Sequence, residues 1–160
     1  MLFGNEDALA VHTVASASHQ VLRDLAEKRG NSEFHASLKI MIKPGMEKEF
    51  WKVMNKTANF LKHADRDPEA LLNGVKENIN ELTIAGGCLY YKSLGFELTP
   101  TMRVFMVWFS VMNPHLLADD DPMKRLLDEK QFQSIRSQSR IDQLEIGKLL
   151  LEQVQKQITP

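Results

Sequence analysis

The residues from 59 to 68, N-F-L-K-H-A-D-R-D-P, form the densest polar cluster of the chain. The apolar spacing over residues 46–64 predicts a helix with one apolar and one polar side. Asn59, His63 and Arg66 fall on the polar side, and Lys62 is adjacent to them. Amide and cationic donors grouped in this way bind phosphate or carboxylate groups. Asn59, Lys62, His63 and Arg66 are therefore the candidate ligand-binding residues for a small anion, beside the interpretation that the cluster has only a structural role.

Two carboxylates belong to the same cluster. Asp65 projects from the core-facing side of the helix, where a buried carboxylate needs a hydrogen bond or an ion pair. The candidate partners on other helices are His12, His19 and Arg103. Asp67 precedes a proline and can cap the helix that follows. Asp65 and Asp67 are therefore interpreted as structural, and the alternative that the cluster marks only a helix end remains open.

The cluster resembles the N-F-F-K-H-A-D-R-D-P signature of a family of small, uncharacterised bacterial helical proteins, with Leu61 in place of the second phenylalanine. The segments Ala10–Leu25 and Thr99–Leu117 also resemble that family. The resemblance implies a helical fold and a bacterial origin. It leaves the function open, because no activity is assigned to the family.

Other site chemistries have weaker patterns. Five histidines are present, but His12 and His19 are seven residues apart and lack the i,i+4 spacing of a helical metal site. We therefore predict no metal and no cofactor. No Ser-His-Asp order or nucleophile elbow is visible, so catalytic residues stay unassigned. The single cysteine, Cys88, excludes an internal disulfide and is expected to be inert in the core.

An enzymatic alternative comes from Arg29 and His35. Their spacing fits the loose Arg-to-His pattern of HEPN-type helical ribonucleases, in which both residues cut RNA, usually in a dimer. The alternative function is therefore a HEPN-like ribonuclease or a nucleotide-binding helical domain. The pair lies in the least regular stretch of the chain, and this pattern is common by chance.

The composition limits the class of protein. The 160 residues suit one domain, and the 20 basic and 21 acidic residues give a net charge of -1. This balance argues against a strongly basic nucleic-acid wrapper. The basic stripe of Lys48, Lys52 and Lys56 is better explained as a solvated helix face. Nucleic acid is therefore not expected as a partner.

The compartment is predicted from targeting signals. The first seven residues carry acids where a secretory signal needs positive charge. The most apolar stretch, Val104–Phe109, is far shorter than the roughly 20 residues of a membrane span. We expect a cytoplasmic protein with no membrane contact.

Helical patterns follow one another along the chain. The first begins at a cap on Asn5, has Val14 and Val21 on its apolar face, and stops at Gly30. Residues 31–43 are read as irregular or partly helical, although their alternation would also suit a short strand. The remaining helices are expected at 46–64, 78–94, from Thr99-Pro100 to Met112, 123–129 and 132–158. Gly86-Gly87 within the 78–94 helix predicts a close helix crossing.

These patterns predict an all-α, single-domain bundle of five to six helices over residues 1–160. The helix over Thr101–Met112 is apolar on every side and is expected at its buried centre. The last helix has one seam through Ile141, Leu144 and Leu151, with Ile146 and Leu149 on the far side, so we expect a homodimer through it. The alternative, that all of these residues fit one core, remains open. The function expected from the sequence is a non-enzymatic binding or interaction protein.

Overall fold

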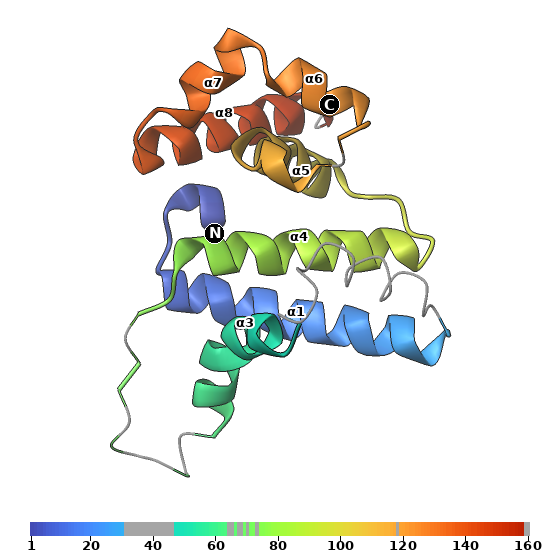
Figure 1. Cartoon of the computed structure of the whole chain (residues 1–160), viewed down its shortest axis with the longest axis vertical. Coiled ribbons are helices and arrows are strands. Elements are labelled where there is room, and N and C mark those ends of the chain that lie inside the picture. The colour runs from blue at the N-terminus through green and yellow to red at the C-terminus, as the bar shows by residue number, and fades with distance from the viewer. Residues whose placement is uncertain are drawn as a thin grey trace. The chain divides into compact units, whose positions relative to one another are not determined.

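The computed structural model describes residues 1–30, 47–63, 66, 69, 71–72, 74–117 and 119–158, and helices are the regular secondary structure of these residues. The predicted all-α class is confirmed. The helices of these residues are η1 (Leu2–Gly4), α1 (Ala8–Lys28), α3 (Glu47–Lys62), α4 (Glu77–Ser93), α5 (Pro100–Met112), η2 (Pro114–Leu116), α6 (Pro122–Leu127), α7 (Lys130–Arg136) and α8 (Arg140–Ile158) (Figure 1). Residues 31–43, predicted to be irregular or partly helical with a short strand as the alternative, lie outside the described ranges.

The chain divides into two compact units. Asp7–Glu97 form the N-terminal unit, and Met1–Glu6 together with Leu98–Pro160 form the C-terminal unit. Each contains its own helix packing, so each is described by itself. The prediction of one domain over the whole chain stays a prediction.

In the N-terminal unit, α1 and α4 run side by side in the same direction (Figure 1). Three contacts follow each other along both helices: His12 with Asn80, His19 beside Gly86, and Arg29 with the Leu94 carbonyl. An ideal Cβ on Gly86 would lie 3.0 Å from His19 Nε2, so a side chain there would press on the histidine ring. The close crossing expected at the glycine pair is confirmed at its first member.

The start and the buried face of α1 differ from the sequence prediction. Asp7, not Asn5, caps the helix, because its Oδ1 accepts from the amides of Leu9 and Ala10 at 3.0 and 2.9 Å. Asn5 instead ends η1 in the left-handed conformation, with φ 51°. Val14 and Val21, expected on the apolar face, are 53% and 58% exposed. The buried face is rotated toward the histidines: the residues packed in the core are Val11, His12 and Ala26, with Leu22 against the Ala26, Tyr90 and Leu94 cluster.

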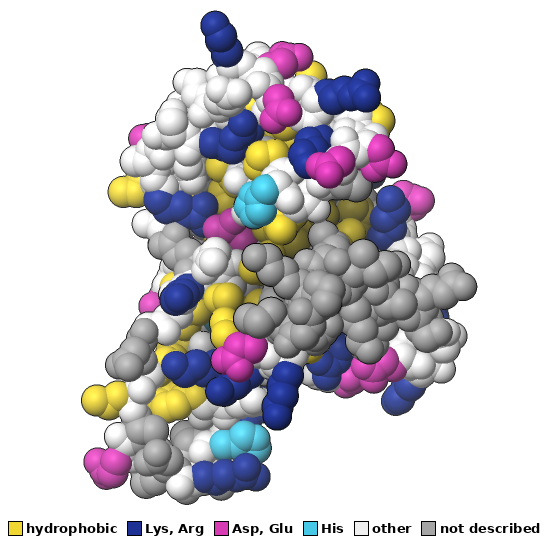
Figure 2. Space-filling model, viewed as in Figure 1, with side chains coloured by type: hydrophobic (Ala, Val, Ile, Leu, Met, Phe, Trp, Pro, Cys, Tyr) yellow, Lys and Arg dark blue, Asp and Glu magenta, His cyan; other side chains and the backbone are white. Residues whose placement is uncertain are grey.

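Helix α3 lies against α1 (Figure 1). It buries Met54 and Thr57, both on the predicted apolar face, whereas Leu61 near its end is 39% exposed. The basic stripe on its far side is solvated as expected: Lys48, Lys52 and Lys56 are all exposed. Acidic and basic side chains are interspersed on the face in Figure 2, consistent with the balanced net charge.

In the C-terminal unit, Thr99 caps α5 and Pro100 occupies its first turn, as the sequence predicts. The helix buries Val104, Phe105, Trp108, Phe109 and Val111, whereas Val107 is 50% exposed. Burial is therefore concentrated on one side of α5, and its place at the centre of a bundle stays a prediction.

Trp108 anchors the contact between α5 and α8. Its indole Nε1 donates to the Gln143 carbonyl at 2.7 Å, and its ring meets Phe3 edge-on at 5.2 Å between centroids. Phe3 in turn lies directly over Gly147 of α8. The side chain of Leu144 is buried on the same face.

The single helix predicted over 132–158 is wrong, because α7 ends at Arg136 and α8 begins at Arg140. Ser139 sits before α8, where its hydroxyl donates to Asp142 Oδ2 at 2.6 Å and accepts from the Asp142 amide at 3.3 Å. This reciprocal pair is a capping arrangement that starts a new helix. The split raises the number of helices above the five to six predicted. The predicted seam is also incorrect at Ile141, which is 70% exposed.

None of the described helices combines the length with the apolar composition that crossing a bilayer requires.

Candidate functional site

The four residues predicted to bind an anion all lie on the surface, at and just beyond the end of α3. Asn59 and Lys62 are in its last turn, His63 follows it, and Arg66 is in a turn. Only Asn59 and Lys62 line a pocket. Asp65 and Asp67 lie outside the described residues, so their structural roles, and the pairing of Asp65 with His12, His19 or Arg103, stay predictions.

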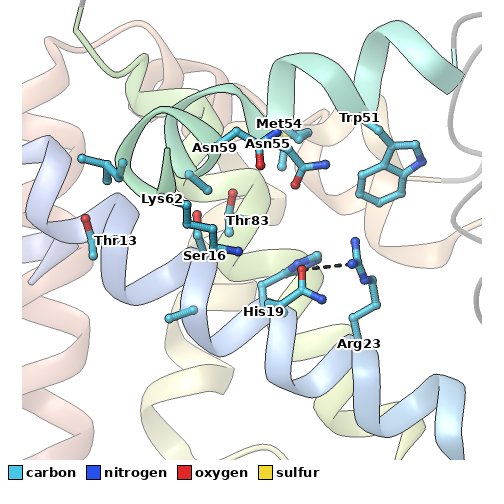
Figure 3. Close-up of a pocket in the computed structure, with 14 residues that line it drawn as sticks. Thr13, Ser16, His19, Arg23, Trp51, Met54, Asn55, Asn59, Lys62 and Thr83 are labelled. Atoms are coloured by element: carbon cyan, nitrogen blue, oxygen red, sulfur yellow. Dashed lines mark hydrogen bonds between the residues drawn. The ribbon is translucent and has the colours of Figure 1, made fainter. Parts of the chain in front are cut away.

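The pocket lies within the N-terminal unit, between α1 and α3, with Thr83 contributed by α4 (Figure 3). We call it the α1–α3 pocket, and its volume is about 370 Å³. Its polar lining comprises three hydroxyl residues, three amides, two cations and one histidine: Thr13, Ser16, Thr83, Gln20, Asn55, Asn59, Arg23, Lys62 and His19. The larger apolar lining residues are Trp51, Met54 and Leu61.

Helix periodicity explains how α1 supplies this lining. Thr13, Ser16, Gln20 and Arg23 recur at intervals of three and four residues, which places them on one face. Arg23 lies toward the end of the pocket where Trp51 is found, and Lys62 lies toward the Ser16 part (Figure 3). Seven residues of helix separate Ser16 from Arg23, a rise of about 10 Å. The two cations therefore serve different parts of an elongated pocket.

The two cations differ in how they are paired. Arg23 Nη2 donates to Gln20 Oε1 at 2.9 Å, the contact dashed in Figure 3. Arg23 Nε forms ion pairs with Glu27 Oε1 at 3.7 Å and Asp24 Oδ1 at 4.0 Å. Both distances are beyond hydrogen-bond reach, so the buried Nε has no hydrogen-bond acceptor among the described residues. Lys62 makes no ion pair with any residue of the described ranges. Both cations can therefore donate to a ligand oxygen without giving up an established hydrogen bond at Nε or Nζ.

A buried polar network, which sequence reasoning missed, lies behind the pocket. Asn80 Nδ2 donates to the Ala8 carbonyl at 2.8 Å, so its Oδ1 must face His12 Nδ1, at 2.9 Å. An amide oxygen only accepts, so Nδ1 carries the proton and the Nε2 of the neutral ring accepts from the Ser16 hydroxyl, at 3.0 Å. His12 and Asn80 are 0% and 1% exposed.

The network has a partial signal in the sequence. His12 and Ser16 are four residues apart and therefore adjacent on one helix face. The Asn80 contact joins residues 68 positions apart, and it exists because α1 and α4 are parallel. The sequence analysis considered His12 only as a partner of Asp65 or a metal ligand, whereas its ring is completely buried against Asn80 and Ser16.

The other candidates from the sequence are the Arg29–His35 pair, a metal site and Cys88. Arg29 donates to the Leu94 carbonyl at 3.3 Å and lies over the Phe96 ring, whereas His35 is outside the described residues. In the described part of the chain, no three His, Cys, Asp or Glu side chains gather as metal ligands would. Cys88 is buried as expected, and burial raises the pKa of its thiol to about 11. The thiol is therefore protonated at neutral pH, which makes it a poor nucleophile.

We compared the chain with known protein families, curated proteins and solved structures. No family model matches the chain, and neither a curated protein nor a solved structure matches it.

Proposed function

We propose that this chain is a non-enzymatic binding protein that holds a small organic anion in the α1–α3 pocket. The observation that carries the proposal is that Lys62 and Arg23 line one pocket together with the amides of Asn55 and Asn59. Guanidinium and ammonium groups form charge-assisted hydrogen bonds with carboxylate and phosphate oxygens, and these are about twice as strong as neutral ones. An anion is therefore the ligand that this lining favours.

Arg23 strengthens the case. A buried N–H without an acceptor costs about 1–3 kcal/mol, and Arg23 Nε is in that position. The atom has almost no exposed surface, so a ligand oxygen would reach Nε only after the side chain shifted, and it would then recover that free energy. The guanidinium also holds Gln20, so its orientation is set before a ligand arrives.

The proposed site keeps half of the set predicted from the sequence. Asn59 and Lys62 remain, Arg23 and Asn55 are added, and His63 and Arg66 are not part of the lining. The His12 imidazole cannot serve as an acid–base group for a ligand, because it is completely covered and both of its nitrogens are engaged.

The test is a titration with inorganic phosphate, acetate and citrate, followed through amide chemical shifts in two-dimensional NMR spectra. We expect saturable shifts in α1 and α3, and affinity reduced about tenfold or more by Lys62→Ala or Arg23→Gln, since a hydrogen bond to a charged group contributes about 1.5–3 kcal/mol. The matched control is Lys52→Ala on the same helix, whose side chain is 74% exposed, pairs with Glu49 and lies outside the pocket. Anion binding that Lys62→Ala and Arg23→Gln leave unchanged would contradict the proposal.

The proposal includes a family and a compartment. We propose that the chain belongs to the bacterial family whose motif the Asn59–Pro68 segment resembles, and that it is cytoplasmic. If this is right, other proteins with that motif carry cations at the positions of Arg23 and Lys62. If proteins with this motif lacked both cations, the motif would not indicate an anion pocket, and this part of the proposal would be wrong.

It also includes a homodimer through α8. Leu149 and Leu150 on this helix are 50% and 38% exposed, and exposed apolar side chains of this size favour association. Light scattering on the eluting protein should give twice the chain mass, and Leu149→Lys should reduce it to the chain mass. A monomer at all concentrations would refute this part. The ribonuclease alternative stays a prediction, and comparing RNA cleavage by the wild type and His35→Ala tests it.

A further inference from the structure

The hydroxyl groups of the α1–α3 pocket share a property that restricts the ligand. Thr13 Oγ1 donates to the Leu9 carbonyl at 2.8 Å, and Thr83 Oγ1 donates to the Ile79 carbonyl at 2.7 Å. Each hydroxyl has one hydrogen and two lone pairs. With the hydrogen engaged within its own helix, each group can offer a ligand only an acceptor.

The hydrogen of the Ser16 hydroxyl is also engaged, through the network of Asn80 and His12. The Ala8 carbonyl fixes the orientation of the Asn80 amide, and the amide fixes the proton of His12 on Nδ1. The bare Nε2 of His12 then takes the Ser16 hydrogen at 3.0 Å. Ser16 therefore also presents only lone pairs to the pocket.

These acceptors lie together because of the parallel register of α1 and α4. His12 is level with Asn80, and His19 is level with Gly86, so Ser16 is level with Thr83. Figure 3 shows Ser16 and Thr83 pointing toward α3 from the two helices that form the floor of the pocket. We call Thr13, Ser16 and Thr83 the acceptor floor.

We propose that the ligand is a hydroxylated anion, such as a sugar phosphate or a sugar acid. This inference rests on the proposed anion-binding function and narrows its ligand class. The acidic group is held by Lys62 and Arg23, and the ligand's own O–H groups donate to the acceptor floor. An unsubstituted alkyl anion would satisfy the cations but leave the three acceptors without donors.

The charge of the pocket favours hydroxyl over ammonium donors. An ammonium group on the ligand would also donate to the acceptor floor, but it would be repelled by the cations of Arg23 and Lys62. A neutral O–H group donates without this repulsion. The Asn55 and Asn59 amides on α3 each offer a donor and an acceptor, which suits further hydroxyl groups of the same ligand.

The test compares ligands that differ only in their hydroxyl groups. Gluconate is paired with hexanoate, and glucose 6-phosphate with hexyl phosphate, and sorbitol serves as the uncharged polyol. Isothermal titration calorimetry gives the dissociation constant of each. We expect the hydroxylated member of at least one pair to bind tenfold or more tightly than its alkyl counterpart, and the two pairs distinguish carboxylate from phosphate. We also expect glucosamine 6-phosphate to bind more weakly than glucose 6-phosphate.

Variants assign the preference to the acceptor floor. Ser16→Ala and Thr13→Val should each reduce the ratio of alkyl to hydroxylated dissociation constants about fivefold, the effect of one hydrogen bond. Thr13 is exposed, and valine has nearly the same shape as threonine. Thr13→Val therefore remains informative if Ser16→Ala disturbs the buried His12. The control is Ser18→Ala, an exposed serine of the same helix that does not line the pocket.

The outcomes separate the two proposals. Equal affinities within both pairs, with Lys62→Ala still weakening all four anions, overturn the hydroxylated ligand and leave the anion site standing. Tighter binding of the amino sugar phosphate also overturns the neutral-donor class. No binding of any anion, or sorbitol binding as tightly as gluconate, overturns the proposed function itself.

Discussion

The buried network of His12, Asn80 and Ser16 makes a quantitative prediction about stability. Asn80→Ala removes the acceptor of the His12 Nδ1 proton and the donor to the Ala8 carbonyl. The imidazole N–H cannot find water, because the ring is completely buried. An orphaned buried donor costs about 1–3 kcal/mol, and the lost bond to Ala8 adds about 1 kcal/mol. We therefore expect the free energy of unfolding to fall by about 2–4 kcal/mol.

The assay has to report on the N-terminal unit, because the chain divides into two units and a single global transition is not assured. Amide hydrogen exchange of α1 and α4 measures the stability of the helices that the network joins. The control is Asn78→Ala, an exposed asparagine in the first turn of α4, which should change stability by no more than about 0.5 kcal/mol.

Nitrogen-15 NMR of the histidine ring gives a second, independent readout of the same reasoning. In the wild type, the His12 proton should be on Nδ1, since the Asn80 oxygen faces that nitrogen. A proton on Nε2, or an Asn80→Ala variant as stable as Asn78→Ala, would refute both the network and the acceptor state assigned to Ser16.

Three other perturbations test the packing. Gly147→Ala would place a Cβ 2.6 Å from Phe3 Cδ1, so calorimetric melting should show a loss of about 1–3 kcal/mol. In a Phe3→Ala background the same change should be neutral or stabilising, because alanine favours a helix by about 1 kcal/mol over glycine. The Cys88 pKa is raised from 9.0 to about 11 in the folded state, so its contribution to stability is complete below pH 9 and is lost as the pH rises to 11. Urea titrations should show a fall to which Cys88 contributes about 2 kcal/mol by pH 11, and Cys88→Ala should remove that part. A separate fall from Tyr90, whose pKa is raised from 10.0 to about 12, should remain between pH 10 and 12. Ser139→Ala should reduce stability by about 1 kcal/mol through loss of the α8 cap, and an unchanged melting temperature would count against that cap.

Local chemistry in the sequence was sufficient for most helix ends. Thr99 and Pro100 start α5 through a side-chain cap and a preset φ, and Gly30, with φ 71°, follows the end of α1. These signals act within a few residues, so they can be recognised without knowledge of the fold. The start of α8 has such a signal in Ser139 and Asp142, and the sequence prediction overlooked it.

Which side of each helix is buried was harder to predict from the sequence. Periodicity places residues on a face, but it does not say which neighbour that face will meet. Val14 and Val21 look like core residues by this measure and are exposed, while the polar His12 is buried because Asn80 and Ser16 satisfy both of its nitrogens. Whether a polar group can be buried depends on partners that are distant in sequence.

The candidate site shows the same division. The amino-acid sequence by itself determined that Asn59 and Lys62 lie on the polar face at the end of a helix, because spacing of three to four residues defines that face. It could not select Arg23 or the acceptor floor. These depend on α1 and α4 being parallel and on α3 lying against α1, and such contacts join residues up to 72 positions apart. The tertiary structure alone decided which polar residues share a pocket, since a hydrogen bond or a pocket wall requires atoms within a few ångströms of one another.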